Sequence, residues 1–215
     1  MRLLEEEYCY IIDGVFPDHI IAGFTKPNLE GNLPEDIKGA LAFLGNDFSV
    51  SYLNQQHSDR INFVEEGGIY KGDGLFSAGE NLALVVRTAD CLPLFFYDIK
   101  KEIIGIVHMG WQGAVSGILN NIESDFSSAI VVAGVGMRQC CYQVGEDFLD
   151  YLNLSDFLIR KNDRLYFDPV GFVRKKTNKS SFFDLDICSF CSPYGFFSYR
   201  KTKCKDRTLS FIAKV

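Results

Sequence analysis

Two apolar runs of strand length lie close together near the middle of the chain. Residues 92–97 and 103–107 are almost purely apolar, and a charged segment separates them. Such a pattern predicts an antiparallel hairpin. Cys91 precedes the first run and His108 follows the second. Because the open ends of an antiparallel hairpin meet, we expect Cys91 and His108 to be neighbours.

Similar runs predict further strands, and apolar positions at helical spacing predict a few helices. Because the strands come in pairs with a helix after every few strands, the pattern favours an α+β fold, with mixed β-sheets and helices outside them. No linker or repeat interrupts the chain, so we expect a single domain over residues 1–215. The predicted strands cover 8–16, 20–24, 50–53, 61–64, 82–86, 129–133 and 182–187, with a closing hairpin of 196–200 and 208–215. The predicted helices cover 34–44, 114–126, 144–152 and a basic stretch within 163–179.

Composition excludes several classes of protein. The 215 residues are 47% apolar, which argues against disorder, and no apolar run is long enough to span a bilayer. The net charge of −6 and the pI near 5.1 disfavour nucleic acid as a partner. The acidic start of the chain differs from a signal peptide, so we expect a cytoplasmic protein. The sequence leaves the oligomeric state open.

Seven cysteines, an odd number, favour reduced thiols or metal ligands over a disulfide framework. Cys91 beside His108 is typical of a transition-metal or nucleophile site, although a small core cysteine next to a strand-end histidine fits equally well. Cys188 and Cys191, with Cys204 downstream, form one CxxC that lacks a clear fourth ligand. Structural thiols are therefore the favoured interpretation there.

Only three histidines are available for a histidine-dependent site. His19 follows a proline and an aspartate in a predicted turn, and we expect it at the surface. His57 lies in the polar segment 55–60 between two predicted strands, where it is either a solvated turn residue or a site residue. His108 is the histidine of the central hairpin.

Several motifs, in this order and spacing, resemble those of the YfiH family, also called the laccase-domain or multicopper polyphenol oxidase-like family. The resemblance covers about residues 23–215. Its motifs are QQHS (55–58), TADCLPL (88–94), HMGWQG (108–113), CYQVG (141–145) and FFSYRK (196–201), with CSFC (188–191) just upstream.

This resemblance implies a YfiH-like fold and a zinc ion held by His57, Cys91 and His108. Two nitrogens and one thiolate leave a fourth tetrahedral position open, which is the catalytic pattern of zinc sites. Cys91 and His108 would then be catalytic. Asp90 would orient a ligand histidine or carry a proton.

Purine nucleoside chemistry is the activity that the resemblance implies: phosphorolysis of adenosine, inosine, guanosine or methylthioadenosine, and deamination of adenosine. Arg60 and Arg200 are the candidates for phosphate binding, with Arg87 a weaker one. Asp73, between two glycines, is either a substrate contact or a turn former. Trp111 either stacks on a base or packs in the core.

The chain departs from the family pattern at two positions. Gln112 stands where the family has arginine, and Val135 follows Gly134 where the family has proline. Both departures bear on substrate or phosphate affinity more than on metal binding.

Two alternative activities use the same residues. A copper-dependent polyphenol oxidase is less favoured, because a multicopper site needs more histidines than the three in this chain. A cysteine-nucleophile hydrolase or amidase would use Cys91 as a thiolate beside His108.

Overall fold

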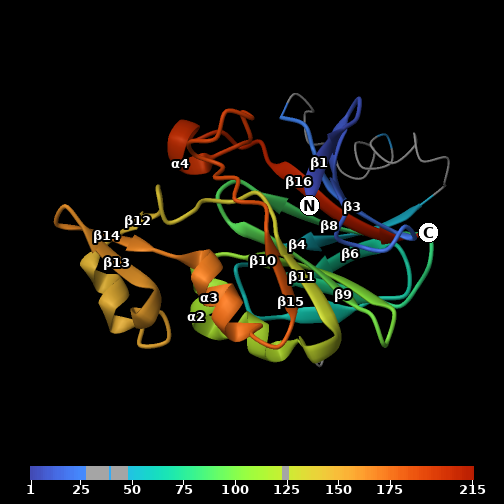
Figure 1. Ribbon diagram of the computed structural model, residues 1–215, viewed down its shortest axis with the longest axis horizontal. Helices are drawn as coiled ribbons and strands as arrows, with labels where there is room; N and C mark the ends of the chain where they lie inside the picture. Colours follow the sequence, from blue (N-terminus) through green and yellow to red (C-terminus); the bar gives the residue numbers. More distant parts are fainter. Residues whose placement is uncertain (28–38, 40–47, 123–125) are drawn as a thin grey trace.

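The computed structural model describes residues 1–27, 39, 48–122 and 126–215. The helix predicted at 34–44 lies outside the described residues, Gly39 excepted. Among the described residues, no helix is long and apolar enough to cross a membrane. Figure 1 shows sheets in the centre of the molecule, α2 and α3 against one side of them, and a small sheet at one end.

The first sheet has seven strands in the order β1-β2-β3-β16-β8-β4-β6. It is mixed, because β4 runs parallel to β8 and β6 while the other neighbours are antiparallel. Its strands are β1 (Arg2–Glu5), β2 (Cys9–Asp13), β3 (Ile20–Thr25), β16 (Thr208–Lys214), β8 (Leu82–Thr88), β4 (Ser49–Asn54) and β6 (Gly68–Lys71).

The second sheet has six strands in the order β15-β11-β9-β10-β7-β5, and a third, small sheet has the order β12-β14-β13. The predicted central hairpin is confirmed: β9 pairs antiparallel with β10, and His108 lies opposite Pro93. The six strands are β15 (Ser181–Asp184), β11 (Ala129–Ala133), β9 (Leu92–Asp98), β10 (Ile103–Met109), β7 (Gly74–Ser77) and β5 (Ile61–Phe63). The small sheet consists of β12 (Gln143–Val144), β14 (Arg164–Phe167) and β13 (Leu158–Lys161).

Two hydrophobic layers explain why β9 is a continuous apolar run. Phe95 and Tyr97 belong to a core between the two large sheets, which also contains Phe24 and Ile212 of the first sheet. Leu94 and Phe96, on the opposite face of β9, belong to a second core under the helices. A strand buried on both faces has no polar side to alternate with. This arrangement confirms the predicted α+β class with mixed sheets; the single domain over 1–215 stays a prediction.

The helices are short, and two of the predicted ones are wrong. The segment 114–126 does not form one helix, because Gly117 adopts the left-handed conformation (φ 88°) and ends α2 after Ser116. Residues 144–152 form a strand end and a 3-10 turn instead of an α-helix. The basic helix is confirmed as α3. In the described part of the chain, the helical elements with defined bounds are α2 (Trp111–Ser116), α3 (Pro169–Lys176) and α4 (Tyr199–Thr202), with 3-10 turns η1 (Ile118–Asn121), η2 (Phe126–Ser128), η3 (Glu146–Asp150) and η4 (Ser155–Phe157).

The predicted closing hairpin is also wrong. Residues 196–198 are irregular and Tyr199 begins α4, with the Ser198 side chain accepting a hydrogen bond from the Lys201 amide as N-cap. The last strand, β16, pairs with β3 and β8, which come from far earlier in the chain. As a result, α4 and the segment after it are free to lie beside the end of the central hairpin.

Candidate metal and substrate site

Three loops or strand ends bring His57, Cys91 and His108 together. His57 lies between β4 and β5, Cys91 immediately precedes β9, and His108 is the penultimate residue of β10. Cys91 Sγ lies 3.8 Å from His57 Nε2, and one ligand atom from each of the three residues lies within 4.8 Å of the others. The structure therefore brings together all three residues of the predicted metal set.

Gly110 makes room for this cluster. A Cβ atom at this position would lie 3.0 Å from His57 Cδ2 and 3.1 Å from Cys91 Sγ. Any side chain there would crowd two of the three residues. This explains in physical terms the glycine that follows His108 and Met109 in the HMGWQG motif.

The buried carboxylate of Asp73 accepts hydrogen bonds from both histidines of the cluster. Its side chain is completely buried, and Oδ1 accepts hydrogen bonds from His108 Nδ1 (2.8 Å) and from the His57 amide (3.0 Å). Oδ2 accepts from the Ser58 amide and hydroxyl, both at 2.7 Å, and from the Gln56 amide at 3.2 Å. One carboxylate thus fixes both histidines, and it holds His57 in a left-handed backbone conformation (φ 56°) that a non-glycine residue rarely adopts.

The predicted role of Asp73 as a substrate contact needs correction. With no exposed surface and five hydrogen-bond donors around it, this carboxylate is not placed to touch a substrate. It is the hydrogen-bond partner of His108, one of the candidate ligand histidines, a role for which Asp90 was the candidate from the sequence. Asp90 instead accepts hydrogen bonds from the Ser189 hydroxyl and the Arg200 amide, at 2.9 and 2.7 Å.

The three ionisable groups stabilise one another's charged forms. Burial disfavours the Cys91 thiolate, but His108 and His57 outweigh it and lower the pKa of the thiol to about 6. Burial also disfavours the charged His108 ring, yet Cys91 and Asp73 raise the pKa of that ring to about 9. For Asp73, the hydrogen bonds from His108 and Ser58 outweigh burial and lower the pKa to about 2. Without a metal, these opposite pKa shifts favour a thiolate–imidazolium pair of Cys91 and His108 near neutral pH.

The donor set fits a transition metal. Because Nδ1 of His108 donates to Asp73, the other ring nitrogen is left for a metal, the arrangement of carboxylate–histidine–metal sites. Zinc bond lengths of about 2.3 Å to sulfur and 2.0 Å to nitrogen place tetrahedral S and N ligands roughly 3.5 Å apart. The 3.8 Å between Cys91 Sγ and His57 Nε2 is close to this value.

A cavity of about 590 Å³ opens over the cluster, a size typical of small-molecule sites. Of the predicted site residues, Asp90 and Arg200 line it together with His57, Cys91 and His108. Arg60 does not: its side chain is exposed and is not part of the cavity wall. Trp111 fits both of its interpretations, because it lines the cavity and also packs on Phe148, with ring centroids 5.1 Å apart.

Much of the positive charge in this cavity comes from residues that the sequence motifs did not indicate. Lys203 and Arg207 line it with Arg87 and Arg200, whereas Asp90 is the one acidic residue among the described residues of its wall. Lys203 Nζ and the Arg207 guanidinium lie 5.0 and 5.8 Å from the centre of the Tyr199 ring. Cation–π contacts with this one ring therefore keep the two cations close together. The signal was present in the sequence as five basic residues within 200–207.

Alkylation can test the electrostatics of Cys91. In metal-stripped protein, we expect iodoacetamide to modify Cys91 with a midpoint near pH 6, because only the thiolate reacts and the protonated form prevails below that pH. Cys140 is the internal control, because burial and Cys188 raise its pKa to about 11. Mass spectrometry of peptides across a pH series measures both. A Cys91 midpoint near the ordinary 9.0 would contradict this electrostatic account.

Comparison with known proteins agrees with the fold and the motifs. The chain is 32% identical to a purine nucleoside phosphorylase from Borreliella burgdorferi over 94% of this chain and 95% of that one. It is 33% identical to one from Clostridium acetobutylicum over 77% of each chain. Among solved structures, YfiH from Bacillus licheniformis superposes with a TM-score of 0.85 at 22% identity, and YlmD from Geobacillus stearothermophilus with 0.84 at 18%, each covering 98% or more of both chains.

A family model described as multi-copper polyphenol oxidoreductase laccase matches residues 31–214, nearly the whole chain. The likeness to the solved structures adds the fold, and the motifs around His57, Cys91 and His108 add the site. The chain therefore belongs to this family, the YfiH family that its sequence motifs resemble.

Proposed function

We propose that the protein is a zinc-dependent purine nucleoside phosphorylase that also deaminates adenosine. The observation that carries the proposal is the cavity, where a metal-ligand set opens onto a wall of four cationic side chains in a protein of net charge −6. A local excess of positive charge in an acidic protein is suited to a specific anion such as phosphate. The relatives named purine nucleoside phosphorylase support the phosphorylase part of this proposal.

His57, Cys91 and His108 would hold the zinc ion, which would supply Lewis-acid activation of an oxygen atom in the cavity. Asp73 keeps the two histidines oriented and the His108 ring in one tautomer. The three-residue set leaves an open ligand position, which favours the deamination of adenosine as a second reaction at this site.

Phosphorolysis requires a phosphate oxygen to form a bond to the sugar C1′ atom while the bond from C1′ to the purine nitrogen breaks. Arg200 is our candidate for positioning the phosphate, because it lines the cavity at the start of α4. Its guanidinium lies 5.3 Å from the centre of the Tyr142 ring and donates to the Gln143 carbonyl, so it is held in place. The departing base needs a proton, and Asp90 is our candidate carrier because it is the acidic residue among the described residues of the wall.

A second candidate, a cysteine-nucleophile hydrolase, is favoured by the thiolate–imidazolium pair of Cys91 and His108. A multicopper oxidase finds less support. Of the three histidines, His19 is exposed at a different place, where its ring contacts the Tyr97 hydroxyl at 3.2 Å, so only two histidines reach the cavity. Copper centres for oxygen reduction need more histidine ligands than that.

A product-resolved assay tests the proposed function. Adenosine, inosine, guanosine and methylthioadenosine are incubated with the protein, with and without inorganic phosphate. We expect free base and sugar 1-phosphate only when phosphate is present, and inosine from adenosine in both cases. Cleavage of amide substrates without any nucleoside turnover would instead establish the cysteine hydrolase.

Arg200 gives a residue-level prediction. We expect Arg200→Gln to raise the KM for phosphate about tenfold, the effect of losing one charge-assisted hydrogen bond. Zinc content should stay unchanged, because Arg200 contacts none of the three ligand residues. Arg60→Gln is the matched control: its side chain lies outside the cavity, and its KM should equal that of the wild type. Equal effects of the two substitutions on KM would contradict the assignment.

A further inference from the structure

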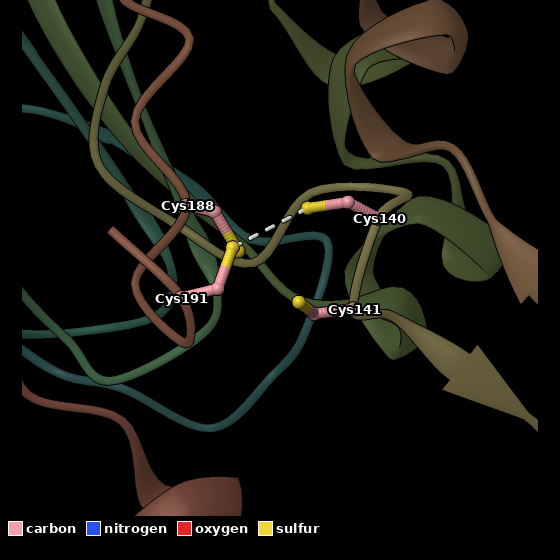
Figure 2. Close-up of side chains that lie close together, drawn as sticks. All are labelled: Cys140, Cys141, Cys188 and Cys191. Atoms are coloured by element: carbon pink, nitrogen blue, oxygen red, sulfur yellow. Dashed lines mark hydrogen bonds between the residues drawn. The ribbon is translucent and has the colours of Figure 1, made fainter. Parts of the chain in front are cut away.

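Four of the seven cysteines form a second cluster, separate from Cys91. Cys140 and Cys141 lie in the turn that follows Arg138, and Cys188 and Cys191 lie in the segment after β15. Figure 2 shows the four sulfur atoms converging from these two segments. All four sulfurs lie within 4.8 Å of one another, and none is in a disulfide. Cys204, which the sequence placed near the CxxC, is not part of the cluster; its thiol contacts the Asp206 carbonyl.

The spacing of the sulfurs fits one metal ion. Cys140 Sγ and Cys191 Sγ are 3.7 Å apart, far longer than a disulfide bond of about 2.05 Å. In a tetrahedral zinc site with bonds of about 2.3 Å, neighbouring sulfurs lie roughly 3.8 Å apart. A cluster of several iron atoms would need its outer sulfurs farther apart.

The backbone around Cys188 is arranged for a thiolate. The Ser192 amide donates to the Cys188 carbonyl at 3.0 Å and closes the CxxC segment into a turn. Burial disfavours ionisation of the Cys188 thiol, but amides of Arg138, Cys191 and Phe190 outweigh it and lower its pKa. Amides that point at a cysteine sulfur stabilise its negative charge, which is the form that binds a metal.

Burial and the neighbouring thiols disfavour ionisation of Cys140 and Cys141. The pKa of Cys140 is raised to about 11, by burial and by Cys188, and that of Cys141 is raised by burial and by Cys191 and Cys140. Several thiolates in so small a space repel one another unless a cation lies between them. A divalent cation would remove that repulsion.

We propose that Cys140, Cys141, Cys188 and Cys191 form a closed, tetrahedral zinc site with a structural role. Four protein ligands leave no open position, in contrast to the set of His57, Cys91 and His108. Thiolates are soft ligands, which select zinc over magnesium or calcium. Nothing in the proposed nucleoside chemistry requires this second ion, so the inference stands independently of that proposal.

The zinc would join two segments that shape the substrate cavity. Tyr142, which follows Cys141, lines the cavity. Ser189, between Cys188 and Cys191, donates to Asp90 Oδ1 at 2.9 Å, and the Met137 amide donates to the Asp90 carbonyl at 2.7 Å. The cluster therefore lies directly behind Asp90, the residue before Cys91. A metal ion that joins the two segments would hold Tyr142 and Asp90 in place in the cavity wall, although the ion itself lies outside the cavity.

Metal analysis of single variants tests the proposal. The wild type, purified in reducing buffer with added zinc, should contain about two zinc ions per chain, one for each ligand set. Cys91→Ala should keep about one of them, and Cys91→Ala combined with both Cys188→Ser and Cys191→Ser should lose both, because two thiolates alone hold zinc weakly. Cys204→Ser is the matched control, because it removes a thiol outside both clusters, and it should keep both ions.

A spectrum gives a readout that does not depend on the folding of a cysteine variant of the cluster. Co²⁺ added to metal-stripped Cys91→Ala protein should give the intense visible bands and the sulfur-to-metal charge transfer of tetrahedral thiolate coordination. Added Zn²⁺ should displace it and raise the Tm by several degrees, because the ion binds only the folded state. If Cys91→Ala contains no zinc and shows no thiolate–cobalt spectrum, or if its zinc survives the combined Cys188→Ser and Cys191→Ser substitutions, the proposal is wrong.

Discussion

Asp73→Asn should weaken zinc binding at the proposed site in the cavity and lower phosphorolytic activity about 10- to 100-fold, the usual cost of losing an outer partner of a metal ligand. We expect the upper end of this range because Asp73 serves two ligands at once, through His108 Nδ1 and the His57 amide. Asparagine has the same size but only one acceptor oxygen. Its NH₂ group would face donors that now point at a carboxylate oxygen. Metal content and kcat/KM for inosine, measured on the same sample, report both effects.

Asp73→Asn should also lower the free energy of unfolding. A buried carboxylate replaced by a group that leaves donors unpaired costs on the order of 3–5 kcal/mol. Denaturant unfolding of the metal-stripped forms measures this term without the metal. Asp13→Asn is the control, because it removes a carboxylate from the surface pair with Arg2. If Asp73→Asn kept wild-type metal content and activity, Asp73 would not organise the site.

Cys91→Ala should abolish metal binding at the cavity and reduce turnover more than about a hundredfold, beyond the cost of an outer partner, because it removes a ligand itself. Two histidines alone make a weak site for zinc. In the same variant, the pKa of His108 should fall toward its ordinary value, since Cys91 is the charge that raises it most. An NMR titration of the His108 ring in metal-stripped protein measures that shift.

Cys91→Asp separates a ligand from a nucleophile. A carboxylate is an accepted zinc ligand, so this variant should retain part of the zinc and a measurable part of the phosphorolysis. A carboxylate cannot replace a thiolate that forms a thioester. A zinc-loaded Cys91→Asp protein without any activity, beside an active wild type, would therefore favour the nucleophile role and contradict the ligand role.

The hairpin at the centre of the site was predictable because its signal is local. Continuous apolar runs of strand length with a charged turn between them leave few other pairings, and the pairing fixes Cys91 beside His108. The strand at 208–215 was also predictable as a strand. Its partners were not, because β16 pairs with β3 and β8 and no local pattern encodes contacts over such sequence distances.

The end of the helix predicted at 114–126 was misplaced because a single residue, Gly117, determines where α2 ends. Apolar spacing continues through Ile118, Leu119 and Ile122, all of which are buried as expected. The chain nevertheless turns at Gly117, because glycine takes a left-handed conformation at little cost and ends the helix there. A glycine inside a periodic stretch was the available warning.

The residues that surround the candidate ligands were harder to predict from the sequence than the candidate ligands themselves. Asp73 gathers donors from a loop before it and from a strand well after it in the sequence, so its role depends on the fold. The same holds for Lys203 and Arg207, which reach the cavity only because α4 replaces the predicted hairpin. Cys140 and Cys141 meet the CxxC for the same reason: their segments come together in three dimensions.

The turnover of inosine with phosphate, measured before and after removal of metal, tests the proposed zinc site of the cavity most directly. Chelator-treated protein should stop forming hypoxanthine and ribose 1-phosphate, and zinc alone should restore both products in equal amounts. Unchanged turnover in protein shown to be free of metal, or hypoxanthine released without phosphate, would contradict the proposed role of His57, Cys91 and His108.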